Sequence, residues 1–146
     1  MNKYITVHDD RFELYLTEKK IQTRVKALGR KVSRDYKGRV PIFIGILNGA
    51  FVFMADLIRH VDIDCEIDFM IRLISQHHPR SFKVVTLLYK KDAAKIRVPI
   101  NYVGFVIPNY FVIGYGLDYA QKVRNLRGIY RLSDKRNDKL NKAEKR

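Results

Sequence analysis

The sequence contains a single cysteine, Cys65, and no tryptophan among its 146 residues. One cysteine excludes an internal disulfide framework and any cysteine-rich zinc site. The first residues also lack the uninterrupted apolar segment and the small-residue cleavage site of a secretory signal. We therefore expect a protein of the reducing cytoplasm.

Acidic residues are few compared with basic ones, since 15 Asp and Glu face 29 Lys and Arg and the formal net charge is +14. Residues 1–39 hold 11 basic and 5 acidic side chains, residues 120–146 hold 10 and 3, and the middle of the chain is almost neutral. A basic exterior attracts any polyanion, whether nucleic acid, acidic membrane or phosphorylated metabolite. The simpler interpretation is a solvated basic surface.

Residues 98–117 form a long stretch without charge, so a transmembrane segment has to be considered there. Prolines, glycines and asparagines interrupt this stretch, and two segments rich in β-formers fit it better. We expect no contact with a membrane. The length and the hydrophobic fraction of 47% favour one folded domain over residues 1–132, followed by a basic, frayed tail over residues 133–146.

The apolar pattern predicts an α/β fold with an open, mainly parallel sheet flanked by helices. Residues 17–36 have the spacing of an amphipathic helix, for which Thr17 is a suitable cap, and residues 51–60 resume a helical pattern. Residues 40–47 are almost continuously apolar, as in a strand buried on both faces of a parallel sheet. Further strands are expected at residues 65–70, 83–88, 102–107, 111–115 and 128–132.

Ligands of an open parallel sheet bind beyond the carboxyl ends of its strands. The first strand is followed there by Asn48 and Gly49, where a glycine lets backbone N–H groups approach an anion. Lys90 follows the third strand and Asp118 follows the fifth. A glycine turn, a lysine and a carboxylate suit a phosphorylated substrate held with Mg²⁺, although many α/β domains place such residues at strand ends.

Two longer stretches identify a family. Residues 41–59 with 65–69, and residues 102–119 with 124–126, resemble the hypoxanthine (hypoxanthine-guanine) phosphoribosyltransferases, which have the type I phosphoribosyltransferase fold. The similarity runs from about residue 12 to residue 132. It implies a cytoplasmic purine-salvage enzyme that transfers ribose-5-phosphate from phosphoribosyl pyrophosphate (PRPP) to a 6-oxopurine, releases pyrophosphate and uses Mg²⁺.

The resemblance also implies roles for individual residues, whose types suit those roles. A lysine can donate to a carbonyl, an aromatic ring can stack on a base, and a carboxylate oxygen can bind a hard cation. The pyrophosphate loop corresponds to Leu47, Asn48 and Gly49, and the pyrophosphate-side arginine to Arg124. The purine site corresponds to Lys90, Phe111 and Val112, and the Mg²⁺-associated carboxylate to Asp118.

Without the family match, each of these residues has a plainer interpretation. Phe111 can belong to the core, Lys90 can be a solvated loop lysine, and Asp118 can cap a short helix over residues 119–123. The neighbouring His77 and His78 are a weak indication of a metal site, because adjacent side chains of a strand point to opposite faces.

The sequence lacks a segment of several tens of residues that this family carries after the second strand. That segment includes a mobile Ser-Tyr loop, a core strand and an acidic PRPP motif, Glu-Asp-x-x-Asp-Thr-Gly, which holds the ribose and supplies the proposed general base. No such motif occurs in the 146 residues, so no catalytic base is assigned and turnover by this chain is expected to be lost. We expect a smaller sheet and association into a homo-oligomer that covers exposed apolar surface.

Two alternatives stay open at this point. The chain is either a shortened purine-salvage transferase or a catalytically inactive remnant that still binds a purine or nucleotide through Lys90, Phe111 and Val112. A third possibility, a basic nucleic-acid-binding protein, is supported only by the charge excess at both ends, and specific nucleic-acid binding is not expected.

Overall fold

The computed structural model describes residues 2–46, 48–68, 81–91 and 99–133. From the first helix onward, its elements follow the order of helices and strands expected from the sequence. Leu47, the pair His77 and His78, the connection over residues 71–80 and nearly all of the expected tail lie outside the described residues. The elements are β1 (Tyr4–Val7), β2 (Asp10–Leu16), α1 (Glu18–Asp35), β3 (Ile42–Ile44), α2 (Phe51–Ile58), β4 (Glu66–Asp68), β5 (Val85–Tyr89), β6 (Tyr102–Val106), β7 (Val112–Ile113) and β8 (Ile129–Leu132).

Over the described ranges, the strands confirm a mixed α/β fold, but the parallel ones do not join into one open sheet. β3 pairs with β4 and β5 pairs with β6, both in parallel register, and these are two separate two-stranded sheets. A third sheet has four antiparallel strands in the order β1-β2-β8-β7. The expected strand over residues 111–115 is therefore shorter than predicted and belongs to the antiparallel sheet.

Helix α1 forms where the apolar spacing predicts it. The Thr17 hydroxyl accepts a hydrogen bond of 3.3 Å from the Lys20 backbone N–H, so Thr17 caps the helix as expected. The apolar stripe of the helix is buried, and at its C-terminal end the Asp35 carboxylate accepts a hydrogen bond of 3.0 Å from the Tyr102 hydroxyl of β6. The buried stripe consists of Ile21, Val25, Leu28 and Val32.

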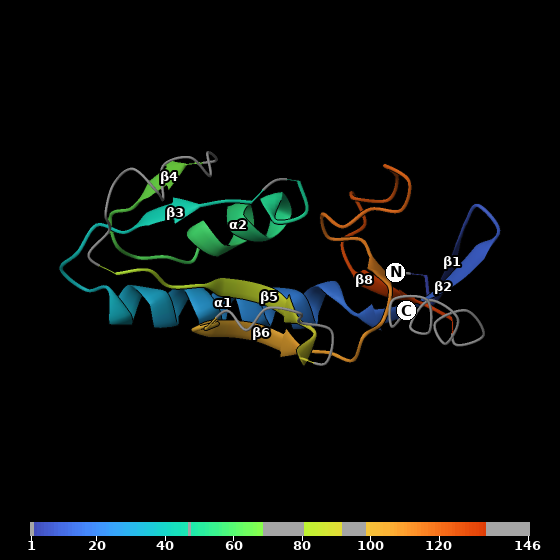
Figure 1. The fold of residues 1–146 in the computed structure, drawn as a ribbon, viewed down its shortest axis with the longest axis horizontal. Helices are drawn as coiled ribbons and strands as arrows, with labels where there is room; N and C mark the ends of the chain where they lie inside the picture. Colours follow the sequence, from blue (N-terminus) through green and yellow to red (C-terminus); the bar gives the residue numbers. More distant parts are fainter. Residues whose placement is uncertain (1, 47, 69–80, 92–98, 134–146) are drawn as a thin grey trace.

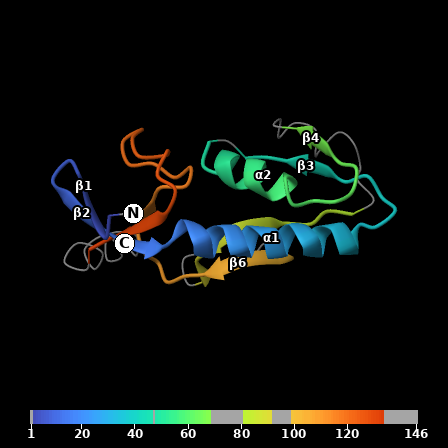
Figure 2. The same ribbon diagram turned by 180° about the vertical axis from the view of Figure 1, so that it is seen from behind.

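The main core lies between α1, α2 and the parallel strand pairs. In Figures 1 and 2, α1 runs along the long axis of the molecule, from the antiparallel sheet past α2, β5 and β6. Phe53 and Leu57 of α2 share this core with Leu87 of β5 and with the buried stripe of α1. Helix α1 approaches the turn after α2 so closely at Gly29 that a Cβ atom there would lie 2.5 Å from the carbonyl oxygen of His60.

The second core is formed by side chains of the antiparallel sheet, at the other end of the molecule. Phe12 of β2, Ile113 of β7 and Tyr130 of β8 are almost completely buried in it. The hairpin of β1 and β2 was not predicted from the sequence. Its signal was available, because Phe12, Leu14 and Leu16 occupy alternate positions of β2. This alternation is the period-2 signal that indicates a half-buried strand.

Several large apolar side chains remain exposed on the parallel strands and their flanks. Ile46 and Val106 expose 65% and 64% of their surface, and Ile42 exposes 59%. Association into a homo-oligomer stays a prediction.

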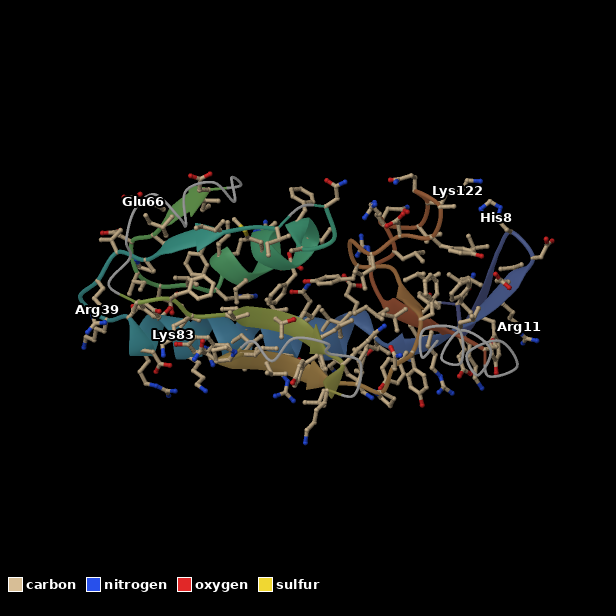
Figure 3. The ribbon with its side chains drawn as sticks, viewed as in Figure 1. His8, Arg11, Arg39, Glu66, Lys83 and Lys122 are labelled. Atoms are coloured by element: carbon tan, nitrogen blue, oxygen red, sulfur yellow. The ribbon has the colours of Figure 1, made fainter. Side chains whose placement is uncertain are left out.

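None of the described helices combines the length and apolar character needed to cross a membrane, and residues 99–117 contain β6 and β7 instead of a helix. Polar side chains lie at both ends of the long axis in Figure 3, with Arg39, Glu66 and Lys83 at one end and His8, Arg11 and Lys122 at the other.

We predict that Gly29→Ala destabilises the protein, although alanine is the better helix former. The usual gain is about 0.5–1 kcal/mol, whereas overpacking a close contact costs about 1–3 kcal/mol. Because the added methyl group would meet backbone and Cβ atoms of His60, the contact should dominate. Urea unfolding should show a lower free energy of unfolding, while Lys26→Ala on the exposed face should change it by less than about 0.5 kcal/mol. An increase in stability for Gly29→Ala would contradict the close packing of α1 on α2.

Candidate functional site

The segment between β3 and α2 contains two of the predicted site residues, Asn48 and Gly49. The Asn48 carbonyl accepts a hydrogen bond of 3.3 Å from the Phe51 N–H, and the Ala50 carbonyl accepts one of 2.9 Å from the Met54 N–H. These bonds close the first turn of α2 directly after Gly49. The N–H groups at the start of a helix favour an anion, so the geometry of this segment agrees with the predicted chemistry.

The segment from Gly114 to Leu126 is an irregular loop, which we name the 114–126 loop. Gly114, Tyr115 and Gly116 all have left-handed backbone angles, with φ of 89°, 53° and 93°. The backbone N–H of Tyr115 donates to the Leu126 carbonyl at 2.8 Å, and that of Gly116 donates to the Arg124 carbonyl at 2.9 Å. The loop therefore folds back on itself, with its first residues bonded to its last.

Gly116 brings this loop against Gly49. A Cβ atom at Gly116 would lie 2.8 Å from the carbonyl oxygen of Gly49, and a Cβ atom at Gly49 would lie 3.3 Å from the Leu117 side chain. Both the positive φ and the close approach favour glycine at position 116. The structure thus places two segments together that are more than 60 residues apart in the sequence.

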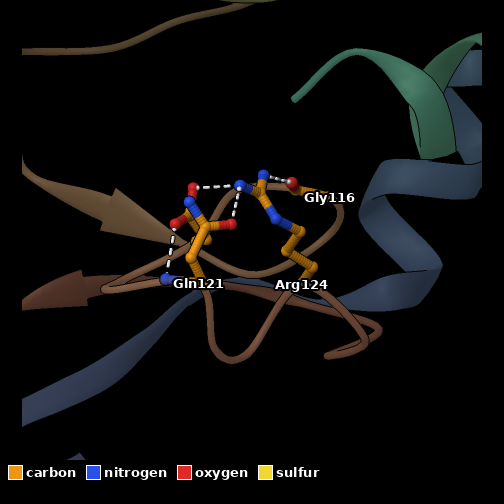
Figure 4. A network of polar contacts seen from close by, with 4 residues as sticks. Gly116, Gln121 and Arg124 are labelled. Atoms are coloured by element: carbon orange, nitrogen blue, oxygen red, sulfur yellow. Dashed lines mark hydrogen bonds and ion pairs between the residues drawn. The ribbon is translucent and has the colours of Figure 1, made fainter. Parts of the chain in front are cut away.

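An ion pair within the 114–126 loop joins two predicted site residues, Asp118 and Arg124 (Figure 4). Arg124 Nη2 lies 2.7 Å from Asp118 Oδ1, and Nη1 donates to the Gly116 carbonyl at 2.9 Å. Nη2 also donates to Gln121 Oε1 at 3.2 Å, and the Gln121 N–H donates to Asp118 Oδ2 at 2.8 Å. Both side chains remain partly exposed, 29% for Arg124 and 28% for Asp118.

Residues 119–123 do not form the short helix that Asp118 could have capped. Ala120, Gln121 and Val123 have positive φ angles of 49°, 64° and 64°, which a right-handed helix excludes. Instead, Tyr119 and Lys122 exchange backbone hydrogen bonds across a tight turn. Asp118 accepts the Gln121 N–H in this turn, so its capping function is local to the loop.

Phe111 and Val112 lie between the parallel strand β6 and the antiparallel sheet, at the start of β7. The Phe111 ring is half-buried and meets Tyr119 edge to face at a centroid distance of 5.5 Å and Phe12 at 6.2 Å. Val112 belongs to β7 and pairs with Arg131 of β8. Phe111 therefore supports the second core in this structure, as its plainer interpretation predicts, and its stacking on a base stays a prediction.

Lys90 directly follows β5 and is half-buried. The preceding residue, Tyr89, accepts a hydrogen bond of 2.9 Å at its carbonyl from the Ile107 N–H, which continues β6. Ile107 lies four positions before Phe111 in the sequence. Lys90 thus follows the carboxyl end of β5, as the sequence predicts, and Phe111 follows the carboxyl end of the neighbouring parallel strand β6.

Sequence reasoning missed a polar contact between α2 and the 114–126 loop. Asp56 Oδ2 accepts hydrogen bonds of 2.5 Å from the Tyr115 hydroxyl and from Gln22 Nε2 of α1. Burial, and then the hydrogen bond to Asp56, raise the pKa of Tyr115 above its usual range, so the hydroxyl remains a donor at alkaline pH. The available signal was the composition of α2, in which Asp56 is the one charged residue.

Asp118 is the predicted Mg²⁺ ligand, and its surroundings allow only a limited role. Among the described residues, no three His, Cys, Asp or Glu side chains gather at a possible metal site. Mg²⁺ is often held by one or two carboxylates together with substrate phosphates and water. Each Asp118 oxygen already accepts one protein donor but has a second lone pair, so this carboxylate can assist a cation that a phosphate ligand brings with it.

Known proteins similar to this chain include hypoxanthine-guanine phosphoribosyltransferases and a bifunctional protein. The hypoxanthine-guanine phosphoribosyltransferase of Bacillus subtilis is 32% identical over 160 residues, a match that covers 78% of this chain and 89% of that protein. The bifunctional protein TilS/HprT of Listeria monocytogenes is 32% identical over 167 residues, covering 83% of this chain. The chain spans only 26% of that bifunctional relative. No family model matches the chain.

Solved structures of similarly named proteins have the same fold. A hypoxanthine phosphoribosyltransferase from Staphylococcus aureus superimposes with a TM-score of 0.80 at 32% identity, over 92% of this chain and 99% of that one. The enzyme from Trypanosoma cruzi in complex with the product IMP superimposes with a TM-score of 0.76 at 27% identity, over 95% and 99%. These similarities confirm the expected type I phosphoribosyltransferase fold.

The matches also confirm that the chain is internally shorter than its relatives. The Bacillus subtilis match extends over 160 residues, yet it includes only 78% of the 146 residues here, or about 114. The relative therefore has about 46 residues within the matched region that have no counterpart in this chain. This difference agrees with the several tens of residues that the sequence was expected to lack.

We predict that Gly116→Ala destabilises the protein more than Gly38→Ala. Both glycines have positive φ, of 93° and 75°, so both substitutions introduce backbone strain on the order of 1 kcal/mol. At Gly38 no atom lies within 4 Å of the added methyl group, whereas at Gly116 the methyl group would meet the Gly49 carbonyl. The close contact should add about 1–3 kcal/mol to the loss measured by urea unfolding. Equal losses would show that the two segments do not touch in solution.

Proposed function

This chain belongs to the family of hypoxanthine-guanine phosphoribosyltransferases, and we propose that its site is built for the purine-salvage reaction of that family. In this reaction a C–N bond forms between the ribose C1 of PRPP and a nitrogen of hypoxanthine or guanine. The C–O bond to pyrophosphate breaks, and the base loses a proton. The products are IMP or GMP and pyrophosphate.

The observation that supports this proposal is the contact between Gly49 and the 114–126 loop. It places the start of α2 beside the loop that contains Arg124 and Asp118. Helix-start N–H groups and a guanidinium are the donors that a pyrophosphate requires. Two segments with the same ligand preference therefore lie together, although neither identifies a pyrophosphate site alone.

On the base side, we propose that Lys90 donates to the 6-oxo group of the purine. We further propose that Phe111 stacks on the ring and that the Val112 backbone contacts its edge. A lysine can donate to a 6-oxo group but offers nothing to a 6-amino group, which is itself a donor. Adenine should therefore be excluded. The half-buried position of Lys90 strengthens such a bond, because partial exclusion of water increases its electrostatic contribution.

Mg²⁺ belongs to this proposal as a partner of the pyrophosphate. Asp118 would hold the cation together with phosphate oxygens, and Arg124, its ion-pair partner, would contact the same pyrophosphate. When bound, Mg²⁺ neutralises charge on the pyrophosphate. The protein residues have the separate task of orienting the pyrophosphate, through Arg124 and the backbone around Gly49.

The acidic PRPP motif is absent from the sequence, and so are the carboxylates that would hold the ribose and accept the proton. Each lost electrostatic contact of this kind costs roughly 10²–10³ in rate. We therefore propose that this chain retains nucleotide and pyrophosphate binding and has lost useful turnover. Incubation with PRPP, Mg²⁺ and hypoxanthine should yield no IMP by chromatography, and IMP formed at an ordinary enzymatic rate would contradict this part of the proposal.

We predict that Lys90→Met weakens GMP binding by roughly 10- to 100-fold, because a hydrogen bond from a charged donor contributes about 1.5–3 kcal/mol. Isothermal titration calorimetry measures the dissociation constant. Lys91→Met is the matched control, since Lys91 is the next residue and is exposed. It should leave GMP binding unchanged. Adenosine monophosphate should bind weakly to the wild-type chain, and equal effects of the two lysine variants would contradict the assignment of Lys90.

We predict that Asp118→Asn weakens the binding of pyrophosphate in the presence of Mg²⁺ but not in its absence. An amide is a poorer ligand for Mg²⁺ than a carboxylate, and loss of the negative charge also frees the Arg124 guanidinium for the anion. The two effects oppose each other only when Mg²⁺ is present. Calorimetric titrations with and without Mg²⁺ therefore separate them, and the same change in affinity under both conditions would refute a metal function for Asp118.

A further inference from the structure

The carboxylate of Asp56 joins three segments of the chain. Its Oδ2 atom accepts a hydrogen bond of 2.5 Å from the Tyr115 hydroxyl and another of 2.5 Å from Gln22 Nε2. Gln22 belongs to α1, Asp56 to α2 and Tyr115 to the 114–126 loop. Tyr115 is only 5% exposed, and the other two side chains are half-buried. One oxygen atom therefore connects both helices of the main core to the loop.

Tyr115 has an unusual backbone conformation for a large side chain. Its φ of 53° lies in the left-handed region, which sterically disfavours residues other than glycine. Such conformations persist where the surrounding structure determines them. Here the hydroxyl is bonded to Asp56 and the backbone N–H to the Leu126 carbonyl, so both ends of the residue are held.

The same three segments border the proposed pyrophosphate site. Asp56 lies on α2, whose first turn follows Gly49. Tyr115 immediately precedes Gly116, whose carbonyl accepts a hydrogen bond from the Arg124 guanidinium. Gly116 itself lies close to the Gly49 carbonyl, next to the bond between Tyr115 and Asp56. The bond from Tyr115 to Asp56 thus sets the spacing between the start of α2 and the 114–126 loop.

We propose that Asp56 and Tyr115 are positioning residues for the pyrophosphate side of the site. They hold the segment around Gly49 and the loop with Arg124 at the distance that lets both contact one ligand. The identity of that ligand rests on the proposed function, whereas the positioning itself does not. Neither residue is assigned a contact with the ligand.

The test compares Tyr115→Phe with Tyr102→Phe. Both tyrosines are 5% exposed and share the main core, and both hydroxyls donate to a helix carboxylate, Asp56 for Tyr115 and Asp35 for Tyr102. Each variant removes one hydroxyl and keeps the ring. Tyr102 is therefore a matched control for the general cost of losing a buried hydrogen bond.

Two measurements are made on the full chain and its variants. Hydrogen exchange reports the opening of the backbone amides of Tyr115 and Gly116, and calorimetry reports the dissociation constants of inorganic pyrophosphate and of free hypoxanthine. Tyr115→Phe should accelerate exchange at these amides and weaken pyrophosphate binding about tenfold, the loss expected for one hydrogen bond. Hypoxanthine binding should change less than twofold. Tyr102→Phe should leave the loop exchange and both affinities close to wild type.

Failure of this proposal is distinguishable from failure of the proposed function. If the wild-type chain binds no pyrophosphate, the proposed function fails, and hydrogen exchange still decides whether Tyr115 positions the loop. Loop exchange that is unchanged in Tyr115→Phe, or changed equally in Tyr102→Phe, overturns the proposal. Asp56→Asn keeps the shape and one acceptor oxygen, and serves as the second variant should Tyr115→Phe not fold. It should change loop exchange in the same direction.

Discussion

The contact of the 114–126 loop with α2 is the constraint on which the candidate site depends. The loop contains no helix and has only isolated bridges, and its backbone bonds close it on itself, so its place against α2 depends on tertiary contacts. The loop packs on the second core, where the Tyr119 hydroxyl donates to Asp10, and two attachments hold it against α2 and the turn before it: a carboxylate that accepts the Tyr115 hydroxyl and a glycine that lies close to a carbonyl. Asp118 and Arg124 can act on the same ligand as the start of α2 only while these attachments hold.

The internal shortening affects the two halves of the molecule differently. The antiparallel sheet joins four strands around a buried core, and the 114–126 loop connects two of these strands. The parallel strands instead form two separate pairs, each with its own outer edges, and large apolar side chains such as Ile42 and Ile46 stay exposed beside them. The candidate site combines both halves, since the 114–126 loop belongs to the antiparallel half while Gly49 and Lys90 follow strands of the parallel pairs.

Local patterns predicted the helices and most strands, because each is encoded by residues close in sequence. The stripe of α1 and its Thr17 cap are examples, and the apolar run over residues 40–47 led to β3. The sheet topology was not predictable in the same way. Whether β8 pairs with the parallel strands or with β2 depends on partners about 118 positions away, which no periodicity records.

The candidate site was predictable in its residue types and only partly in its geometry. Asp118 and Arg124 meet as an ion pair, and Gly49 lies beside their loop, so two residues chosen from strand ends come together with one named from the family resemblance. The short helix after Asp118 was wrong, because propensity does not reveal that Ala120, Gln121 and Val123 adopt left-handed angles. The bond between Asp56 and Tyr115 joins residues 59 positions apart, and only the tertiary structure reveals it.

The pairing of β2 with β8 also determines the order in which the molecule can be completed. In this sheet Phe12 lies opposite Leu132. Strand β2, near the start of the chain, can therefore gain this neighbour only after β8 has been synthesised. Until β8 is synthesised, the inner edge of the hairpin, along β2, is open as well as the outer edge along β1, and an open strand edge can pair with other chains. Closing a loop of this length is slow compared with forming α1 nearby. The interval before β8 emerges is therefore the period in which a nascent chain is most exposed to aggregation, and a chaperone would protect it best by covering that hairpin.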